Sequence, residues 1–414
     1  MRVVSVDEAA AEIVAAVAVQ PPLRMPLNDA VGHVLAADLN ATIPLPPWTN
    51  AGMDGYAACA VDVRGATDEQ PVALRVVDSI AAGDAATAPL QRGEAARIFT
   101  GAPVPAGADS VIRQEDTARN GDRVLVRRDR DAGANVRRAG ADLAAGALAL
   151  AAGTVIGPHQ VALLAALAVA HPVVHRRPRV GILTSGDELV SLDHPDEVLS
   201  GRKQADANGP ALAALVRQAG GIPVPLGIAR DDANALREMV ESANDVDLLI
   251  TAGGVSVGDH DHVRAVMAAC GVVTHFDRVR LRPGGPTTFG TFPHGGPWLA
   301  LPGNPVSAMI TFELFARPAI RRMSGHRELY AARHRAALRN ATQRDLTLDQ
   351  YLRVTFATAG DGGVPIADLS GAQGSGMLTT LVRASGLVIV PAGSDALPAG
   401  AVVSALRFAS PEVE

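Results

Sequence analysis

A glycine-rich loop is the first stretch of the sequence whose residue types could bind a ligand. The loop, TAGGVSVGD at 251–259, follows a strand-like segment and leads into a helix-like one. Gly253, Gly254 and Gly258 would let the backbone approach an anion closely. Ser256 would add a hydroxyl group, and the helix start would offer free N–H groups and a positive dipole. The spacing predicts a phosphate site, although a tight strand-to-helix turn would explain the glycines equally well.

Four carboxylates flank this loop and the strand-like segment before it. Asp187 and Glu188 occur in TSGDEL, and Asp259 and Asp261 lie at the end of the glycine loop. Carboxylates that converge near a phosphate would repel one another without a cation, and oxygen ligands suit Mg²⁺. All four are therefore candidate metal ligands. Helix capping by Asp187, Asp259 or Asp261 is the alternative, and it requires no metal.

Arginines supply the cations. Lys203 is the only lysine in the chain, so side-chain binding of an oxyanion falls to planar guanidinium groups. Arg278 and Arg280 precede the rigid turn RPGGP, which begins at Arg282. These side chains could hold an oxyanion or could form a solvated strand edge.

Three further turn motifs carry candidate side chains. LPGNPVSA contains Pro302, Asn304 and Pro305, and the last two suit a helix cap and a first helical turn. PPWTNAGMDGYA contains Asp54, and RIFTGAPVPAGADSV contains Thr100. Local turn structure explains all of these residues, and ligand contact is the alternative.

The elements that position the glycine loop alternate between strand and helix. Such alternation predicts βαβ units and a parallel sheet, in which ligands sit at the carboxyl ends of the strands. The expected strands are 178–184, 222–228, 245–251 and 297–301, and the expected helices are 209–221, 232–244, 261–271 and 306–323.

The remaining sequence predicts a multidomain α/β plus β protein. We expect a helical, elongated linker domain (1–42 plus 141–176), an inserted β domain (43–140), a three-layer α/β domain (177–325) and a C-terminal β-barrel-like domain (326–414). The apolar run Val161–Ala170 is half the length that a membrane crossing needs and is interpreted as a buried helix.

Composition limits the classes of function. The net charge of −6 and the pI near 6.0 argue against a general nucleic-acid or anionic-membrane binder. Cys59 and Cys270 are too few for a disulfide framework or a cysteine-bound zinc, which fits a cytoplasmic protein. Acidic residues interrupt the N-terminal apolar stretch, so an amphipathic helix is expected there and not a signal peptide.

Taken together, these motifs resemble the molybdopterin molybdenumtransferase family, which includes the E domain of gephyrin. The matching stretches follow the family order from about residue 43 to 376. They are PPWTNAGMDGYA, RIFTGAPVPAGADSVIRQED, NVRRAGADLAAG, TSGDEL, GIARDDANALR, TAGGVSVGD, RPGGP, LPGNPVSA and GAQGSG.

The resemblance implies a four-domain, elongated subunit and a homodimer with its site near the subunit interface. It implies adenylylated molybdopterin and molybdate as substrates, a requirement for Mg²⁺, and release of AMP. The adenylyltransferase of the preceding step is an implied partner. Carried over by motif, the functional positions are Asp54, Thr100, Asp142, Glu188, Asp231, Asp261, Arg278, Arg282, Pro302, Pro305, Arg353 and Ser375.

One departure from the family pattern concerns the arginine turn. Bacterial members commonly have Lys-Pro-Gly-Lys-Pro where this chain has Arg282 and Gly285, so one cation is absent. A non-catalytic cofactor carrier or scaffold is therefore an alternative hypothesis. A molybdopterin adenylyltransferase is another, but the single-domain adenylyltransferases lack both β regions.

Overall fold

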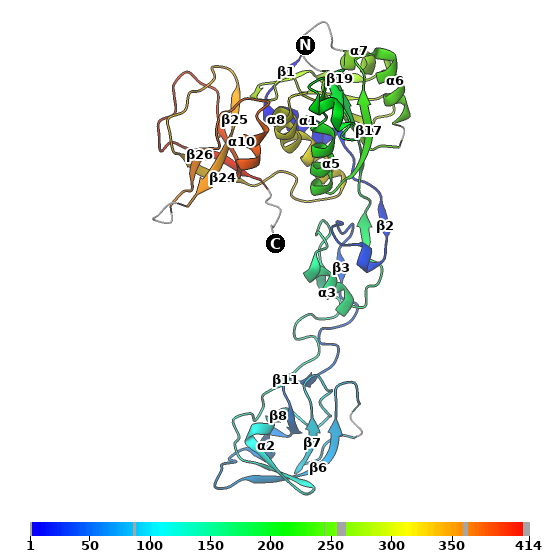
Figure 1. Cartoon of the computed structure of the whole chain (residues 1–414). Helices are drawn as coiled ribbons and strands as arrows, with labels where there is room; N and C mark the ends of the chain where they lie inside the picture. The colour runs from blue at the N-terminus through cyan, green and yellow to red at the C-terminus, as the bar shows by residue number, and fades with distance from the viewer. Residues whose placement is uncertain (1, 86–87, 244, 255–261, 359–362, 409–414) are drawn as a thin grey trace.

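The computed structural model describes residues 2–85, 88–243, 245–254, 262–358 and 363–408 and has an elongated shape (Figure 1). A small β unit lies at one end, a thin linker follows, and an α/β unit and a C-terminal barrel lie side by side at the other end. The expected fold class, with an inserted β region, an α/β region and a C-terminal barrel, is confirmed.

The α/β unit is built on a six-stranded sheet. Across the sheet the order is β17 (Ile222–Ala229), β14 (Arg179–Ser185), β18 (Leu248–Ala252), β23 (Pro297–Leu301), β22 (Thr288–Thr291) and β19 (Val273–Phe276). The first four strands are parallel, as the sequence predicts, and β22 and β19 form an antiparallel edge. From β14 the chain first adds β17 on one side and then crosses over to add β18 on the other side. The strand order therefore reverses beside β14.

Both faces of this sheet are covered. Alternate side chains of the central strands point to opposite cores: Ile250 and Leu299 to one, Leu249 and Trp298 to the other. The first face carries α1 (Val6–Ala16), α5 (Asn208–Ala219) and a continuous helical segment made of α8 (Pro305–Thr311), the π-helical turn η3 (Phe312–Ala316) and α9 (Arg317–Met323). The second face carries α6 (Ala233–Ser242) and α7 (His262–Ala269).

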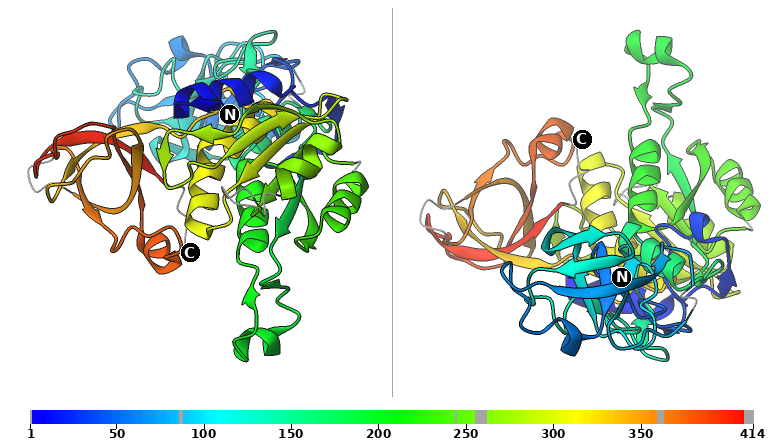
Figure 2. Two further views of the ribbon diagram at one scale, coloured as in Figure 1. Left: turned by 90° about the horizontal axis from the view of Figure 1, so that it is seen from above. Right: turned by 90° about the horizontal axis from the view of Figure 1, so that it is seen from below.

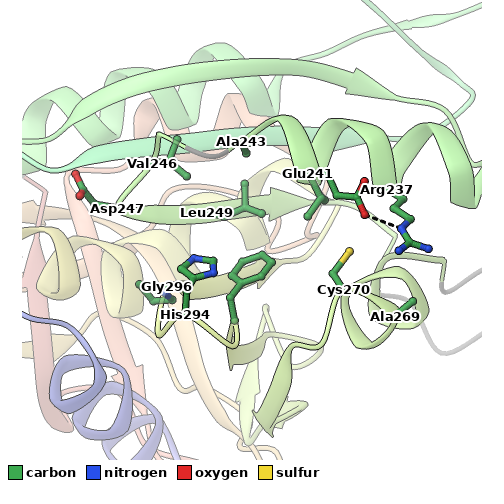
Figure 3. A pocket seen from close by; sticks show the side chains of 13 residues that line it. Arg237, Glu241, Ala243, Val246, Asp247, Leu249, Ala269, Cys270, His294 and Gly296 are labelled. Atoms are coloured by element: carbon green, nitrogen blue, oxygen red, sulfur yellow. Dashed lines mark hydrogen bonds and ion pairs between the residues drawn. The ribbon is translucent and has the colours of Figure 1, made fainter.

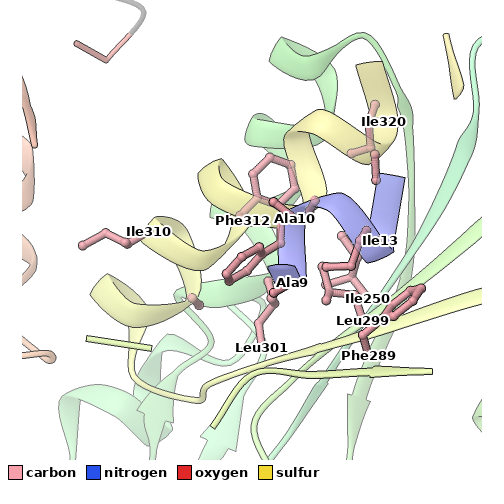
Figure 4. Packing of buried hydrophobic residues seen from close by; sticks show 14 of the residues in the cluster. Ala9, Ala10, Ile13, Ile250, Phe289, Leu299, Leu301, Ile310, Phe312 and Ile320 are labelled. Carbon is pink, nitrogen blue, oxygen red and sulfur yellow. The ribbon is translucent and has the colours of Figure 1, made fainter. Parts of the chain in front are cut away.

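The N-terminal helix belongs to the core of the α/β unit. Ser5 and Glu8 form a capping box at the start of α1, and Ala9 and Ile13 are fully buried. In Figure 4 these side chains lie between the sheet and the helical segment that contains Phe312 and Ile320. Strand β1 (Val3–Val4) also pairs with β20 (Arg278–Val279). The expected grouping of residues 1–42 in one linker domain therefore needs amendment, because the linker begins only at β2.

The linker consists of two passes of the chain that pair with each other. Its ladders join β2 (Pro22–Arg24) to β13 (Val173–His175) and β3 (Leu39–Asn40) to β12 (Leu148–Leu150). The turn η1 (Leu27–Asp29) and the helix α3 (Pro158–Ala166) pack beside them. The expectation of a buried helix at Val161–Ala170 is wrong for most of the run, because α3 ends at Ala166 and only Leu164 and Leu167 are buried. The thin linker has too little apolar surface to cover it.

The inserted β unit contains a second six-stranded sheet. Its order is β8 (Ser110–Arg113), β5 (Gly55–Ala58), β7 (Glu94–Ile98), β6 (Val72–Ile80), β10 (Arg123–Val126) and β9 (Thr117–Asn120). The short helix α2 (Ala60–Val63) and the turn η2 (Gln114–Asp116) complete it, and β4 (Asn50–Ala51) pairs with β11 (Val136–Arg137) where the unit meets the linker.

The C-terminal barrel closes on itself through five strands. These are β25 (Asp349–Ala357), β26 (Ile366–Leu369), β24 (Arg333–Leu338), β28 (Val402–Arg407) and β27 (Gly386–Val390), with β27 pairing back to β25. Strand β21 (Leu281–Arg282) of the preceding unit pairs in parallel with β25, and α10 (Leu378–Arg383) lies beside α8. None of the described helices is long and apolar enough to span a bilayer.

Replacing Ile13 with alanine tests the placement of α1. Ile13 is 0% exposed, so Ile13→Ala should lower the free energy of unfolding of the α/β unit by about 3 kcal/mol, since lost burial and a new cavity both contribute. Leu199→Ala is the matched control, because Leu199 is 83% exposed. Urea unfolding followed by tryptophan fluorescence in a Trp48→Phe background makes Trp298 the sole reporter. Equal effects of the two alanines would contradict the assignment of α1 to this core.

Candidate active site

A cavity of about 520 Å³ lies at the carboxyl ends of the parallel strands. Loops that follow β14, β18 and β23 form its floor, and it sits where the strand order reverses, as expected for a ligand site in an open α/β sheet. The lining residues come from 185–189, 204–208, 253–254 and 303–305, together with Asp231.

Two aspartates lock the ends of neighbouring strands together. Asp187 Oδ1 accepts a hydrogen bond from the backbone N–H of Asp231 at 3.1 Å, and Asp231 Oδ2 accepts one from the N–H of Asp187 at 3.3 Å. The Asp187 side chain therefore bonds to the neighbouring loop, whereas the Asp231 side chain also lines the cavity. Asp187 does not line the cavity, and its bond to the Asp231 N–H differs from the simple helix cap considered for it.

Glu188 is held above a glycine. A Cβ atom on Gly186 would lie 2.7 Å from both Glu188 carboxylate oxygens, and Gly186 has a φ of +149°. The carboxylate of Glu188 therefore occupies space that only glycine leaves open. It is exposed and lines the cavity.

Close backbone approaches bring the other two loops together. A Cβ atom on Gly253 would lie 2.5 Å from the carbonyl oxygen of Ser185, and one on Gly303 would lie 3.3 Å from Gly253 Cα. Gly253 and Gly254 both have positive φ values, of +101° and +65°. These two glycines line the cavity as the sequence predicts for a phosphate loop. Ser256, Gly258, Asp259 and Asp261 lie outside the described residues.

Two residues of the site escaped the sequence reasoning. Asp206 accepts hydrogen bonds from Thr184 Oγ1 at 2.9 Å and from the N–H groups of Asn208 and Gly209 at 3.0 Å. Asn208 Nδ2 donates to the carbonyl of Gly303 at 2.7 Å. These residues tie the start of α5 to the β14 and β23 loops. The stretch DANGP just before a helix was the available signal.

Unsatisfied polar atoms mark the cavity as a binding site. Ser185 Oγ and Asn208 Oδ1 are buried and have no hydrogen-bond partner in the described structure. Both residues line the cavity. Buried polar atoms are almost always paired, so these two are available to a polar partner.

A segment of the chain that leaves the α/β unit and returns to it forms one side of the cavity. Strands β15 (Leu189–Val190) and β16 (Gln204–Ala205) pair in parallel, and α4 (Pro195–Leu199) lies between them in an arm that projects from the α/β unit (Figure 2). Lys203, near the base of the arm, donates to the carbonyl of Asp187. The single lysine therefore contacts the same loop as Glu188.

The barrel contributes to the opposite side. Asn304 and Pro305 line the cavity, and Asn304 Nδ2 donates to Ser375 Oγ of the barrel at 3.0 Å. Pro302 is buried behind them. Arg353 does not line the cavity, because it is 0% exposed beneath the loop that contains Ser375.

The arginines of the proline turn lie beside the cavity and do not line it. Arg280 is 3.7 Å from Glu8, and Arg282 is 3.7 Å from Asp345 of the barrel. Arg278 lies in β20, next to the N-terminal strand. A Cβ atom on Gly285 would be 3.4 Å from its nearest neighbour, so the site of the missing family lysine has room for a side chain.

The remaining predicted residues lie far from the cavity within one chain. Asp54 accepts hydrogen bonds from the N–H and hydroxyl of Thr100, both at 2.8 Å, in the inserted β unit. These bonds, that from the backbone N–H foremost, lower the pKa of Asp54 and keep its carboxylate ionised. Asp142 lies where the inserted unit joins the linker. Figure 1 shows the linker separating this unit from the α/β unit.

A second cavity, of about 490 Å³, lies at the opposite, amino ends of the strands (Figure 3). Its charged side chains are already paired: Arg237 binds Glu241 at 2.7 Å, and Asp247 binds Arg176 at 2.7 Å. Burial raises the pKa of its thiol, Cys270, and so disfavours a reactive thiolate. The charges there satisfy one another and do not select a ligand.

Comparison with known proteins covers nearly the whole chain. Residues 4–168 match the family profile described as MoeA N-terminal region (domain I and II), residues 181–322 match Probable molybdopterin binding domain, and residues 335–408 match MoeA C-terminal region (domain IV). A molybdopterin molybdenumtransferase of Nostoc sp. is 38% identical over 385 residues, which is 91% of this chain and 86% of the relative. One from Staphylococcus aureus is 31% identical over 417 residues, 99% and 97% of the two chains.

A solved structure has the same overall arrangement. The molybdopterin biosynthesis moea protein from Pyrococcus horikosii superposes with a TM-score of 0.83 and 30% sequence identity. The alignment covers 99% of this chain and 100% of that one.

Alanine at Gly253 tests the close contact on which the cavity floor depends. Gly253→Ala should lower the free energy of unfolding by about 2–4 kcal/mol, because the left-handed backbone is strained and the Ser185 carbonyl must also move. Gly295→Ala is the control: its φ is +88°, but no described atom lies within 4 Å of the added Cβ, so it should cost only about 1 kcal/mol. Urea unfolding of both variants gives the difference. Identical losses would show that the contact is not tight.

Proposed function

The chain belongs to the MoeA family of molybdopterin molybdenumtransferases, and from that premise we propose that its cavity binds adenylylated molybdopterin, which receives molybdenum there as AMP is released. The chain is thus a transferase of molybdenum cofactor biosynthesis. The observation that carries the assignment is the cavity at the strand reversal, with four glycines, three carboxylates and two unpaired buried oxygens among its lining residues.

The chemistry of the lining fits a phosphorylated, polar ring system. Gly253 and Gly254 leave backbone accessible at the end of β18, where a phosphate of the pterin would lie. Ser185 Oγ and Asn208 Oδ1 can donate to and accept from polar atoms of the ligand. The dithiolene sulfurs that take up molybdenum belong to the substrate, so no cysteine of this chain is needed.

Magnesium is part of this proposal. No group of three or more His, Cys, Asp or Glu side chains is placed to hold a metal among the residues that the structure describes. Mg²⁺ commonly binds through one or two carboxylates plus substrate phosphates, and Glu188 and Asp231 offer that donor set in the cavity. When bound, the ion would neutralise charge that develops on the phosphate bridge.

The reaction replaces one bond to phosphorus and frees AMP. An oxygen of water or of molybdate attacks the pterin phosphorus as the bond from that phosphorus to the bridging oxygen breaks. AMP leaves with the bridging oxygen and the electron pair of that bond, and the proton of an attacking water passes to solvent. Glu188 and Asp231 would hold the Mg²⁺ that neutralises the bridge, and the glycine loop would fix the pterin phosphate. The adenylyltransferase of the preceding step would supply the substrate, and we expect both proteins to act in the cytoplasm.

A homodimer would complete the site. Asp54 and Thr100 match family motifs but belong to the inserted β unit, which the linker separates from the α/β unit that contains Glu188 (Figure 1). A second copy with its inserted β unit beside the cavity would bring these side chains to the substrate. The elongated linker gives the subunit the reach that such an arrangement needs.

Replacing Glu188 with glutamine tests the proposed chemistry. Glu188→Gln should lower the rate of AMP release from adenylylated molybdopterin, with Mg²⁺ and molybdate present, by about 100-fold, because carboxylate-held Mg²⁺ contributes several kcal/mol. Glu241→Gln, in the second cavity, is the matched control and should retain full activity. Unchanged AMP release in Glu188→Gln would remove this carboxylate from the reaction.

Mixing two inactive variants tests the shared site. Asp54→Ala and Glu188→Ala should each be inactive, and unfolding and refolding them together should restore about a quarter of the activity of the unmodified protein, since half of the dimers carry one intact site. AMP release by the mixture is the measurement. A mixture no more active than either variant would place both residues in a site within one chain.

A further inference from the structure

A loop of the C-terminal barrel is held by side chains and by no regular secondary structure. Residues 371–376 join β26 to α10 and contain three glycines, and Gly371, Ala372, Gly374 and Gly376 are exposed. An exposed glycine-rich loop loses much conformational entropy when it is fixed in one position. Some strong local interaction must therefore hold it in place.

Arg353 and Gln373 provide that interaction by a reciprocal exchange of hydrogen bonds. The Arg353 guanidinium donates through Nη2 to the carbonyls of Ala372 at 2.9 Å and Gly374 at 3.1 Å, the two neighbours of Gln373. The Gln373 side chain accepts from the backbone N–H of Arg353 at 2.8 Å and donates to its carbonyl at 3.2 Å. Each side chain therefore binds the main chain of the other residue. We call this pair the Arg353–Gln373 clasp.

The clasp completes the end of the β25–β26 ladder. Paired residues run from Ala357 to Val354, and the N–H of Ser370 continues the ladder with a 3.0 Å hydrogen bond to the Arg353 carbonyl. The Gln373 side chain then supplies the acceptor for the Arg353 N–H. Gln373 Nε2 also donates to the carbonyl of Gly371 at 2.8 Å, which fixes the first turn of the loop.

Ser375, two residues after Gln373, links the ordered loop to the cavity. Ser375 Oγ accepts from Asn304, and the carbonyl of Ser375 accepts from the N–H of Val306 at 3.2 Å. Val306 is the second residue of α8, and Asn304, at its N-cap, makes no side-chain capping bond. The barrel therefore supplies the cap that α8 lacks, at the helix end that lines the cavity.

Arg353 binds the loop through one of its three guanidinium nitrogens. Its side chain is 0% exposed, and burial lowers its pKa, with no carboxylate contributing among the described residues. Nη2 donates to the two loop carbonyls, whereas Nε and Nη1 are buried and have no hydrogen-bond partner among the described residues. The two Nη2 bonds are charge-assisted, because an arginine keeps its proton on burial.

We propose that Gln373 is a positioning residue for the cavity: with Arg353 it fixes the loop that holds Ser375 against Asn304 and the start of α8. This inference rests on the proposed function, because the cavity is taken as the pterin site. Gln373 touches neither the cavity nor the reacting atoms and acts through Ser375.

Kinetics of Gln373→Ala in the full-length protein test this role. We expect KM for adenylylated molybdopterin to rise about tenfold, with kcat changed less than about twofold, because a loosened wall weakens ground-state and transition-state binding alike. Gln160→Ala is the matched control: Gln160 also makes a side-chain bond to the main chain, at Gly157 in the linker, and its loss should leave KM unchanged. An unchanged KM in Gln373→Ala would overturn the proposal.

Hydrogen exchange and a double variant separate positioning from general stability. The Val306 amide should exchange about tenfold faster in Gln373→Ala, since its partner is the Ser375 carbonyl. If Gln373 acts through Ser375, Gln373→Ala combined with Asn304→Ala should raise KM no further than the worse single change. Additive losses or unchanged Val306 exchange would count against the clasp. If the unmodified protein releases no AMP, the proposed function fails. The role of Gln373 is then still decided by Val306 exchange and by equilibrium binding of AMP, each measured on the unmodified protein and on Gln373→Ala.

Discussion

Burial of the central strands on both faces is the constraint on which the rest of this molecule depends. Ile182 and Leu183 are neighbours in β14 but belong to different hydrophobic cores, and the same alternation recurs in β18 and β23. Strands held from both sides cannot shift in register without exchanging one buried set for the other. Their carboxyl ends are therefore fixed points, and loops rich in glycine can meet there at contact distance. The cavity is a consequence of this rigidity.

The sequence allowed much of this architecture to be predicted, because its strongest signals were local. Alternating strand and helix patterns between 177 and 325 predict the parallel sheet, and glycine at 253 and 254 predicts a loop that comes close to its neighbours. The antiparallel edge of β22 and β19 was missed, because short apolar runs give no direction. The role of α1 was missed for another reason: its amphipathic face predicts burial but does not name the surface that covers it. The largely exposed α3 shows the converse, since its apolar run contributes only one face to a small core when little lies beside it.

Prediction of the site was limited by the same distinction between local and long-range information. Glu188, Asp231 and Asn304 line one cavity, as their motifs suggest, but no spacing rule shows that Asp187 and Asp231 hydrogen-bond each other's main chain. Asp206 and Asn208 were missed because their partners lie on two other loops. Arg353 is expected among ligand-binding residues from its motif, but its complete burial and its two hydrogen bonds to the loop above it could not be predicted from the sequence. A charged residue in a motif is a candidate functional residue, but the sequence does not show which atoms its side chain contacts.

The position of α1 also has a consequence for the order in which the chain acquires its structure during synthesis. Ile13 leaves the ribosome some three hundred residues before Phe312 and Ile320, which belong to the same core. The α/β core cannot close until those residues have emerged. Meanwhile the inserted β unit, complete once β11 ends at Arg137, has all of its own strands available. Between the synthesis of β11 and that of α9, the nascent chain should therefore carry a β unit with all its strands and an amphipathic α1 whose apolar face is not yet covered.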